Sequence, residues 1–106
     1  MTDELLAEMT RRIVEKFHPY RVLLFGSYAC GAQRKDSDVD ILVSMDSDDR
    51  PAKRSMKVSE VAHIRFVPID VLVYTPEEIE ARLALGDFFV KEILGKGQVL
   101  YERDTE

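Results

Sequence analysis

The sequence lacks the features that are typical of membrane proteins, secreted proteins and proteins stabilised by disulfides or cysteine-bound zinc. Among its 106 residues it has one cysteine, Cys30, and no tryptophan. A single cysteine excludes an internal disulfide and a zinc site built from cysteines. No apolar run approaches the roughly 18 residues that a membrane helix needs. The first ten residues are acidic and lack the basic start and apolar core of a signal peptide. We therefore expect a cytoplasmic protein with no membrane partner.

The sequence also lacks internal repeats, low-complexity segments and a recognisable linker. Its length suits one domain, so we expect a single domain over residues 1–106. Basic residues are not in excess, because 20 Asp and Glu stand against 15 Lys and Arg and the net charge is -5. That balance is unfavourable for binding a long nucleic acid or an anionic membrane.

The negative excess lies in one segment, residues 36–49, with the sequence DSDVDILVSMDSDD. This segment holds six aspartates and no basic residue, and the rest of the chain has 15 basic and 14 acidic residues. Most charge runs are solvated loops, but the middle of this one, VDILVSM, has the pattern of a strand. We therefore expect Asp46, Asp48 and Asp49 to lie in a solvated turn, and Asp38 and Asp40 at the start of a strand.

Hydrophobic patterning predicts helices and strands in alternation. Apolar residues at helical spacing predict helices over residues 2–17 and about 52–65, and a short helix is expected over residues 28–33. Thr75-Pro76-Glu77-Glu78 predicts a capped start for the last helix, which Gly86-Asp87 is expected to interrupt. Short apolar runs predict four strands, the third of them rich in β-branched residues and the last at an edge: 21–25, 39–45, 69–74 and 98–101. The order indicates an α/β (or α+β) domain with a small mixed β-sheet flanked by helices.

Three aspartates occupy positions that suit a metal site. Asp38 and Asp40 are two residues apart on a strand, so both side chains point to the same face. Asp70 lies in the next strand, within the apolar run IDVLVY, where a carboxylate needs a partner. If these two strands are neighbours, the three carboxylates converge at one end of the sheet. Hard oxygen ligands of this kind suit Mg²⁺, which binds one or two carboxylates together with water and substrate phosphates.

Gly26 and Ser27 close the preceding strand and suit an anion. Glycine lets a ligand approach the backbone closely, and amides that open a helix bind phosphate. Phosphates at Ser27 and metals at Asp38 and Asp40 would together hold a nucleoside triphosphate. Two metal ions could then activate an attacking hydroxyl and stabilise the leaving pyrophosphate.

Each of these features is common on its own, and the combination is what carries the hypothesis. An isolated Gly-Ser is usually a turn and an Asp-x-Asp pair usually lies on the surface. Two rival motifs fail. A calcium EF-hand loop starting at Asp36 would have Ile41 in place of its glycine and Ser47 in place of its glutamate. A Walker-type phosphate loop would need Gly-Lys-Ser/Thr, which the sequence does not contain.

The same residues resemble a known family. Gly26-Ser27, ten residues and then Asp38-Val39-Asp40 reproduce a Gly-Ser-x10-Asp-x-Asp signature. Within LLFGSYACGAQRKDSDVDILV, and with Asp70 in the later strand, the chain resembles the minimal nucleotidyltransferases of the DNA polymerase beta superfamily over about residues 5–101. The resemblance implies a nucleotidyltransferase fold that moves an NMP from an NTP, with ATP the expected donor, onto an acceptor with Mg²⁺.

The resemblance also implies roles for individual residues. Ser27 would contact the triphosphate beside Gly26, and Asp38 and Asp40 would ligate two Mg²⁺ ions. Asp70 would ligate the catalytic metal and help to deprotonate the acceptor hydroxyl. Proteins of this size look like antitoxins that pair, as hetero-oligomers, with HEPN-domain ribonuclease toxins, and some of these are similar in action to enzymes that transfer AMP to a tyrosine of the toxin.

One position departs from the family pattern. Relatives usually have Arg where this chain has Cys30, and cysteine cannot supply a forked cation. Arg34 and Lys35 are the nearby cations that could bind phosphate in its place. The alternative hypothesis is a nucleotide-binding antitoxin with weak or no catalysis, which acts by protein–protein binding. A transferase acting on RNA or a small molecule is disfavoured, because the chain is acidic and shows no second domain to close the site.

Two predictions concern apolar side chains. Met9, Met45 and Met56 are most simply core residues. Phe88 and Phe89 are consecutive in a predicted helix and cannot both point inward well, so we expect one in the core and one at an interface.

Overall fold

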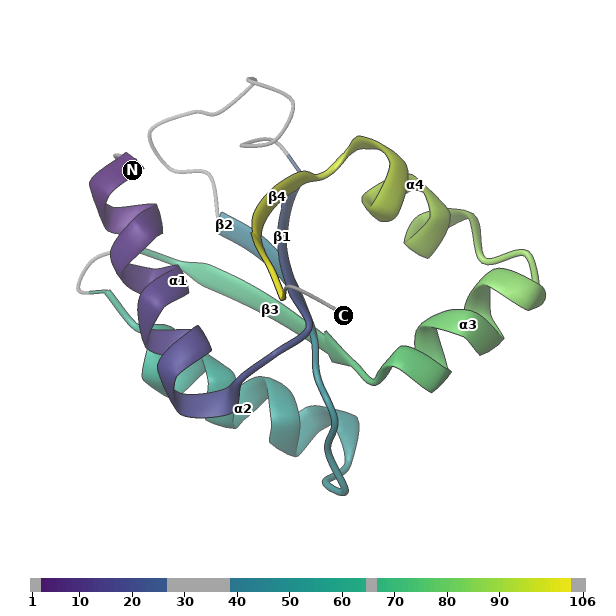
Figure 1. Cartoon of the computed structure of the whole chain (residues 1–106), viewed down its shortest axis with the longest axis horizontal. Coiled ribbons are helices and arrows are strands. Elements are labelled where there is room, and N and C mark those ends of the chain that lie inside the picture. The colour runs from purple at the N-terminus through teal and green to yellow at the C-terminus, as the bar shows by residue number, and fades with distance from the viewer. Residues whose placement is uncertain (1–2, 27–38, 65–66, 104–106) are drawn as a thin grey trace.

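A four-stranded mixed sheet forms the centre of the computed structural model, which describes residues 3–26, 39–64 and 67–103 (Figure 1). The sheet has the order β3-β2-β1-β4. Strand β1 runs antiparallel to β2 and to β4, whereas β2 and β3 are parallel. The strand bounds are Arg21–Phe25 for β1, Val39–Ser44 for β2, Ile69–Tyr74 for β3 and Gln98–Glu102 for β4. The predicted α/β class and small mixed sheet with a terminal edge strand are therefore confirmed.

Four helices flank the sheet in two pairs (Figure 1). Their bounds are Asp3–Phe17 for α1, Pro51–Ala62 for α2, Pro76–Ala84 for α3 and Phe88–Lys96 for α4. The sequence prediction placed α2 over residues 52–65. The helix instead starts at Pro51 and ends at Ala62, because His63 turns to extended backbone and Ile64 forms a bridge with Val67. The short helix predicted over residues 28–33 lies outside the described residues.

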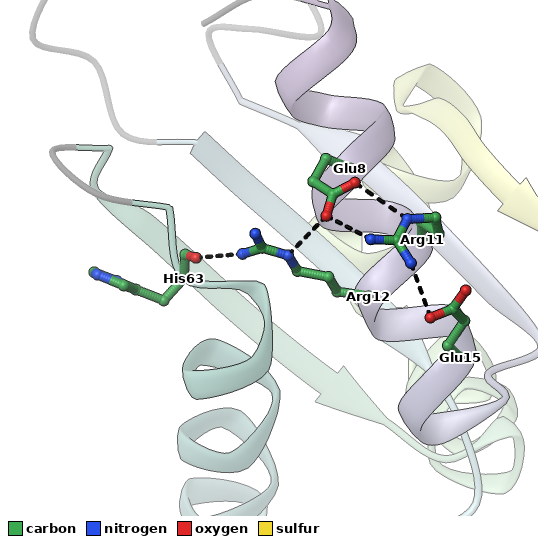
Figure 2. A network of polar contacts seen from close by, with 5 residues as sticks. All are labelled: Glu8, Arg11, Arg12, Glu15 and His63. Carbon is green, nitrogen blue, oxygen red and sulfur yellow. Dashed lines mark hydrogen bonds and ion pairs between the residues drawn. The ribbon is translucent and has the colours of Figure 1, made fainter.

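Helices α1 and α2 cover one face of the sheet. Strand residues alternate between the two faces, so every second residue of β2, starting at Val39, points toward these helices. Arg12 of α1 also donates from Nη1 to the carbonyl oxygen of His63, just beyond α2, at 2.8 Å (Figure 2). The main core is made of buried apolar residues of both helices and three strands: Met9, Ile13, Val22, Leu24, Val39, Ile41, Val43, Met45, Val58, Ala62, Val71 and Val73.

The opposite face of the sheet has a smaller core beneath α4. Leu23 of β1 and Leu42 of β2 are buried there against Ile93 of α4. Four half-buried residues complete it: Phe25, Leu72, Tyr74 and Leu94. Figure 1 shows α3 and α4 together on the side of the sheet away from α1 and α2.

Helix α3 begins with the predicted capping box. The Thr75 hydroxyl accepts a hydrogen bond from the Glu78 amide at 3.2 Å, and Glu78 accepts one from the Thr75 amide at 2.8 Å. Glu78 also binds the nearly buried Arg54 of α2, with Nη1 and Oε1 2.6 Å apart. The predicted break is confirmed as well, because Gly86 has φ +80° and Asp87 caps α4 by accepting from the Val90 amide. These contacts fix the start of α3 against α2 and separate α3 from α4.

Some predictions for apolar residues were wrong. Met9 and Met45 are buried, but Met56 is 56% exposed, because α2 buries the stripe at positions 54, 58 and 62 and Met56 points away from it. Neither phenylalanine of the consecutive pair is in the core, since Phe88 is 73% and Phe89 is 50% exposed. Val90 and Ile93 fill the buried side of α4 instead. In the part of the chain that is described, no helix is long and apolar enough to cross a membrane.

Candidate active site

Two of the three predicted carboxylates meet on the second face of the sheet. Asp40 is the second residue of β2 and Asp70 the second of β3, and the parallel register pairs them directly. Neighbouring strands lie about 4.7–4.9 Å apart, so both side chains are within reach of one cation. Asp40 is half-buried and Asp70 is exposed. The expectation that β2 and β3 are neighbours is therefore confirmed.

The hydrophobic pattern around the two acids sets the face on which they lie. Val39 and Ile41 flank Asp40 in the chain, are fully buried and belong to the main core, as does Val71 beside Asp70. A slip of one residue in either strand would move the valine or isoleucine out of that core and drive the aspartate into it. The apolar neighbours therefore hold both carboxylates on the face opposite the main core.

Gly26 follows β1 and lies against the first carboxylate. Its φ of +75° is in the left-handed region, which favours glycine. A Cβ placed on Gly26 would be 2.3 Å from Oδ2 of Asp40, far inside van der Waals contact. The sequence predicted that glycine here would allow a ligand to come close to the backbone. In the structure, the group that the missing side chain admits is the carboxylate of Asp40.

Four of the other predicted site residues lie outside the described residues. They are Ser27, Arg34, Lys35 and Asp38, and Cys30 falls in the same segment. Within the ranges that are described, no three or more His, Cys, Asp or Glu side chains are grouped to hold a metal ion. Asp40 and Asp70 thus provide two carboxylates at the site, the number that Mg²⁺ commonly takes from a protein before water and phosphate complete its shell.

Two other acids of segment 36–49, Asp46 and Asp49, are engaged elsewhere. Asp46 accepts a hydrogen bond from the Tyr20 hydroxyl at 2.7 Å, and this bond raises the pKa of Tyr20. Asp49 binds Lys57 at 2.7 Å, which lowers the pKa of Asp49. Both follow the carboxyl end of β2, whereas Asp40 lies near its amino end. The prediction that Asp46 and Asp49 follow the strand, whereas Asp40 lies near its start, is confirmed, and the role of Asp40 at a site stays a prediction.

Sequence reasoning missed an aromatic pair at this site. Phe25 is paired directly with Asp40 across β1 and β2, so the order across the sheet is Phe25, Asp40, Asp70. The Phe25 ring contacts that of Phe89 edge to face, with centroids 5.8 Å apart. Because side chains alternate along β1, the sequence could have placed Phe25 on the same face as Leu23. Its position beside Asp40 depends on the pairing register of β1 with β2, which the sequence does not show.

Comparison with known proteins extends these observations. Residues 6–100 match the family described as nucleotidyltransferase domain. A candidate protein adenylyltransferase of Methanocaldococcus jannaschii is 37% identical over 49 residues, which are 46% of this chain and 49% of that protein. The chain thus spans about half the length of the curated relative it matches.

A solved structure shares the fold. The crystal structure of a candidate nucleotidyltransferase from Sulfolobus solfataricus superimposes with a TM-score of 0.65, and the match covers 94% of this chain and 79% of that one. At 23% sequence identity this similarity concerns the arrangement of helices and strands. The family match spans nearly the whole sequence and includes Gly26, Asp40 and Asp70. This chain therefore belongs to the family of nucleotidyltransferase domains.

Proposed function

We propose that this domain transfers AMP from ATP to a hydroxyl group of a partner protein, with Mg²⁺ held by Asp38, Asp40 and Asp70. The observation that supports it most is the pairing of Asp40 with Asp70 on one sheet face, with the Gly26 backbone against Asp40. Two adjacent carboxylates repel each other unless a cation or solvent separates them. In a nucleotidyltransferase, such a cation would bind the phosphates of the nucleoside triphosphate.

The donor set fits Mg²⁺ and not a softer metal. Both described ligands are carboxylates, which are hard oxygen donors, and no cysteine or histidine is placed with them in the described ranges. When bound, Mg²⁺ would neutralise phosphate charge and make an attacking hydroxyl more acidic. Ser27, with Arg34 and Lys35, would bind the triphosphate beside Gly26, because hydroxyl, amide and cationic groups are the usual partners of phosphate.

The position of Asp70 suits a large acceptor. Strand β3 is at the edge of the sheet, and Asp70 is exposed there, whereas Asp40 is half-buried in the adjacent interior strand. An acceptor hydroxyl carried by another protein can reach Asp70 over the β3 edge. Asp70 would take the proton from that hydroxyl, and Asp40 would hold the metal that both substrates share. We propose a HEPN-type toxin as the acceptor, because the sequence resembles the antitoxins of such pairs.

The direct test is transfer of label from ATP. The purified domain is incubated with α-³²P-ATP, Mg²⁺ and the HEPN protein encoded beside it, and label on that protein is measured. We expect transfer by the wild type and by Asp48→Asn, whose exposed acid lies in the turn at the other end of β2. We expect none by Asp40→Asn or Asp70→Asn. No transfer by the wild type, or equal transfer by all four proteins, would contradict the proposal.

The same proteins separate catalysis from binding alone. Cys30 stands where relatives usually have Arg, and this favours the alternative of an antitoxin that neutralises its partner without modifying it. That alternative predicts that a folded Asp40→Asn/Asp70→Asn variant still suppresses the partner's ribonuclease activity. Loss of suppression in this variant, while Asp48→Asn retains it, would exclude the alternative and support transfer.

A further inference from the structure

An aromatic pair borders the acid pair on its interior side. Phe25 is the direct neighbour of Asp40 in the sheet, and the Phe89 ring leans on Phe25 with centroids 5.8 Å apart and planes at 83°. Phe25 is half-buried and Phe89 keeps 50% of its surface exposed. Large aromatic side chains usually bury most of their surface in a core. Half of the Phe89 surface is therefore exposed, one ring contact away from the sheet neighbour of Asp40.

We propose that Phe25 and Phe89 form the platform on which the base of the bound nucleoside triphosphate stacks. This inference rests on the proposed function, because it names the subsite for the base of the same nucleotide. Bases stack on aromatic side chains whatever their identity, since every base has a π face. Neither phenylalanine ring carries a polar atom that stacking would bury without a hydrogen-bond partner.

The order of residues across the sheet separates the two substrates. Phe25 lies on β1, Asp40 on the adjacent β2 and Asp70 on the edge strand β3. One or two strand spacings of about 4.8 Å separate the aromatic ring from the carboxylates. A single ribose bridges a comparable distance between a base and its α-phosphate. The base therefore takes the interior side toward α4, and the β3 edge stays open for the acceptor.

The chain offers a matched control in the preceding residue. Phe88 is also in the first turn of α4 and is 73% exposed. Consecutive helix residues point about 100° apart, so Phe88 does not share the direction in which Phe89 meets Phe25. Replacing each by leucine removes one ring while keeping an apolar side chain and the net charge. The chain also has no tryptophan, so Phe89→Trp would introduce a single fluorescent reporter at the platform.

Calorimetry with two probes tests the platform. Mg²⁺–ATP contains the base, and Mg²⁺–tripolyphosphate contains only the phosphates. We expect Phe89→Leu to weaken ATP binding by roughly fivefold to a hundredfold, the range measured for loss of one stacking ring, and to leave tripolyphosphate binding unchanged. Phe88→Leu should change neither affinity. The fluorescence of Phe89→Trp should be quenched by ATP and not by tripolyphosphate.

The results of these titrations distinguish the stacking platform from the proposed AMP transfer. The wild type could bind both probes while Phe89→Leu loses affinity for both equally, or for neither. Either result would contradict the stacking platform without contradicting the phosphate and metal site. A loss of ATP affinity shared by Phe88→Leu would overturn it as well. If Phe89→Leu does not fold, the Phe89→Trp reporter decides, and an unquenched signal at saturating ATP contradicts the stacking. Wild type that binds neither probe would overturn both proposals.

Discussion

Gly26 satisfies two requirements that no other residue could meet at this site. Its backbone turns at φ +75°, and the side of Gly26 that would carry a Cβ faces Oδ2 of Asp40. The first requirement is conformational and the second is steric. The end of β1 therefore leaves room for the Asp40 carboxylate. A methyl group at Gly26 would occupy the space that the Asp40 carboxylate now fills.

Gly26→Ala separates these two requirements when it is compared with Gly86→Ala. Gly86 has a similar φ of +80° but nothing within 4 Å of its missing Cβ. We expect both variants to lose about 1–2 kcal/mol of unfolding free energy from the left-handed backbone, measured by urea denaturation. Only Gly26→Ala should also lose Mg²⁺–ATP binding, because Asp40 must move. Retained binding in Gly26→Ala would show that the position of Asp40 is not critical.

At the scale of elements, the start of α3 joins two helices through one carboxylate. Glu78 closes the capping box with Thr75 and also binds Arg54, which is 7% exposed in α2. Burial acts to raise the pKa of Glu78, but the hydrogen bonds from the Thr75 amide and from Arg54 outweigh it, and the pKa is lowered. A lowered pKa in the folded state means that the ionised form stabilises the fold.

This arrangement predicts how stability depends on pH. The contribution of Glu78 is present above its unfolded pKa and is lost as the pH falls through its lower, folded pKa. Glu78→Gln keeps an acceptor for the capping box and removes the charge next to Arg54. We expect this variant to be less stable than the wild type at neutral pH and to converge with it in acid. Parallel urea curves with a constant difference at every pH would contradict the assignment.

Local patterns predicted most of the elements, and their failures have local causes. Strands β1 and β3 have the predicted bounds, because each is a short apolar run that glycine or proline closes off: Gly26 follows β1, and Pro68 and Pro76 flank β3. Helix α2 was predicted to run too far. The chain turns to extended backbone at His63, and Ile64 bridges to Val67, only three residues on, instead of continuing the helix. Met56, and one of Phe88 and Phe89, were assigned to the core from hydrophobicity alone, which does not specify the buried side of a helix.

For the whole molecule, the pairing register of the strands determines which side chains are neighbours, and the sequence does not show this register. The sequence predicted that Asp40 and Asp70 would converge if their strands were neighbours, and the parallel pairing of β2 with β3 confirms the condition. The place of Phe25 beside Asp40 depends on the antiparallel register of β1, which is set by the global fold. Ser27, Arg34, Lys35 and Asp38 remain predictions from the motif.

The same topology places the two groups of acids at opposite ends of β2. Asp40 is near the start of the strand, and Asp48 lies in the turn that follows its end. A net charge of -5 is therefore no obstacle to a phosphate ligand, because the acids at the site are the ones a metal would neutralise. The charge of the turn lies at the other end of β2 from Asp40. Asp48 thus serves as a control for any general effect of removing a negative charge.

Calorimetric titration with Mg²⁺–ATP tests the central claim, that Asp40 and Asp70 together form the metal and nucleotide site. Asp40→Asn, Asp70→Asn and Asp48→Asn each remove one negative charge from the same chain. We expect the first two to weaken binding by at least about tenfold, because even the outer partners of metal ligands are worth 10–100-fold. Asp48→Asn should bind as the wild type does. Equal affinity in all four proteins, or an equal loss in all three variants, would contradict the account.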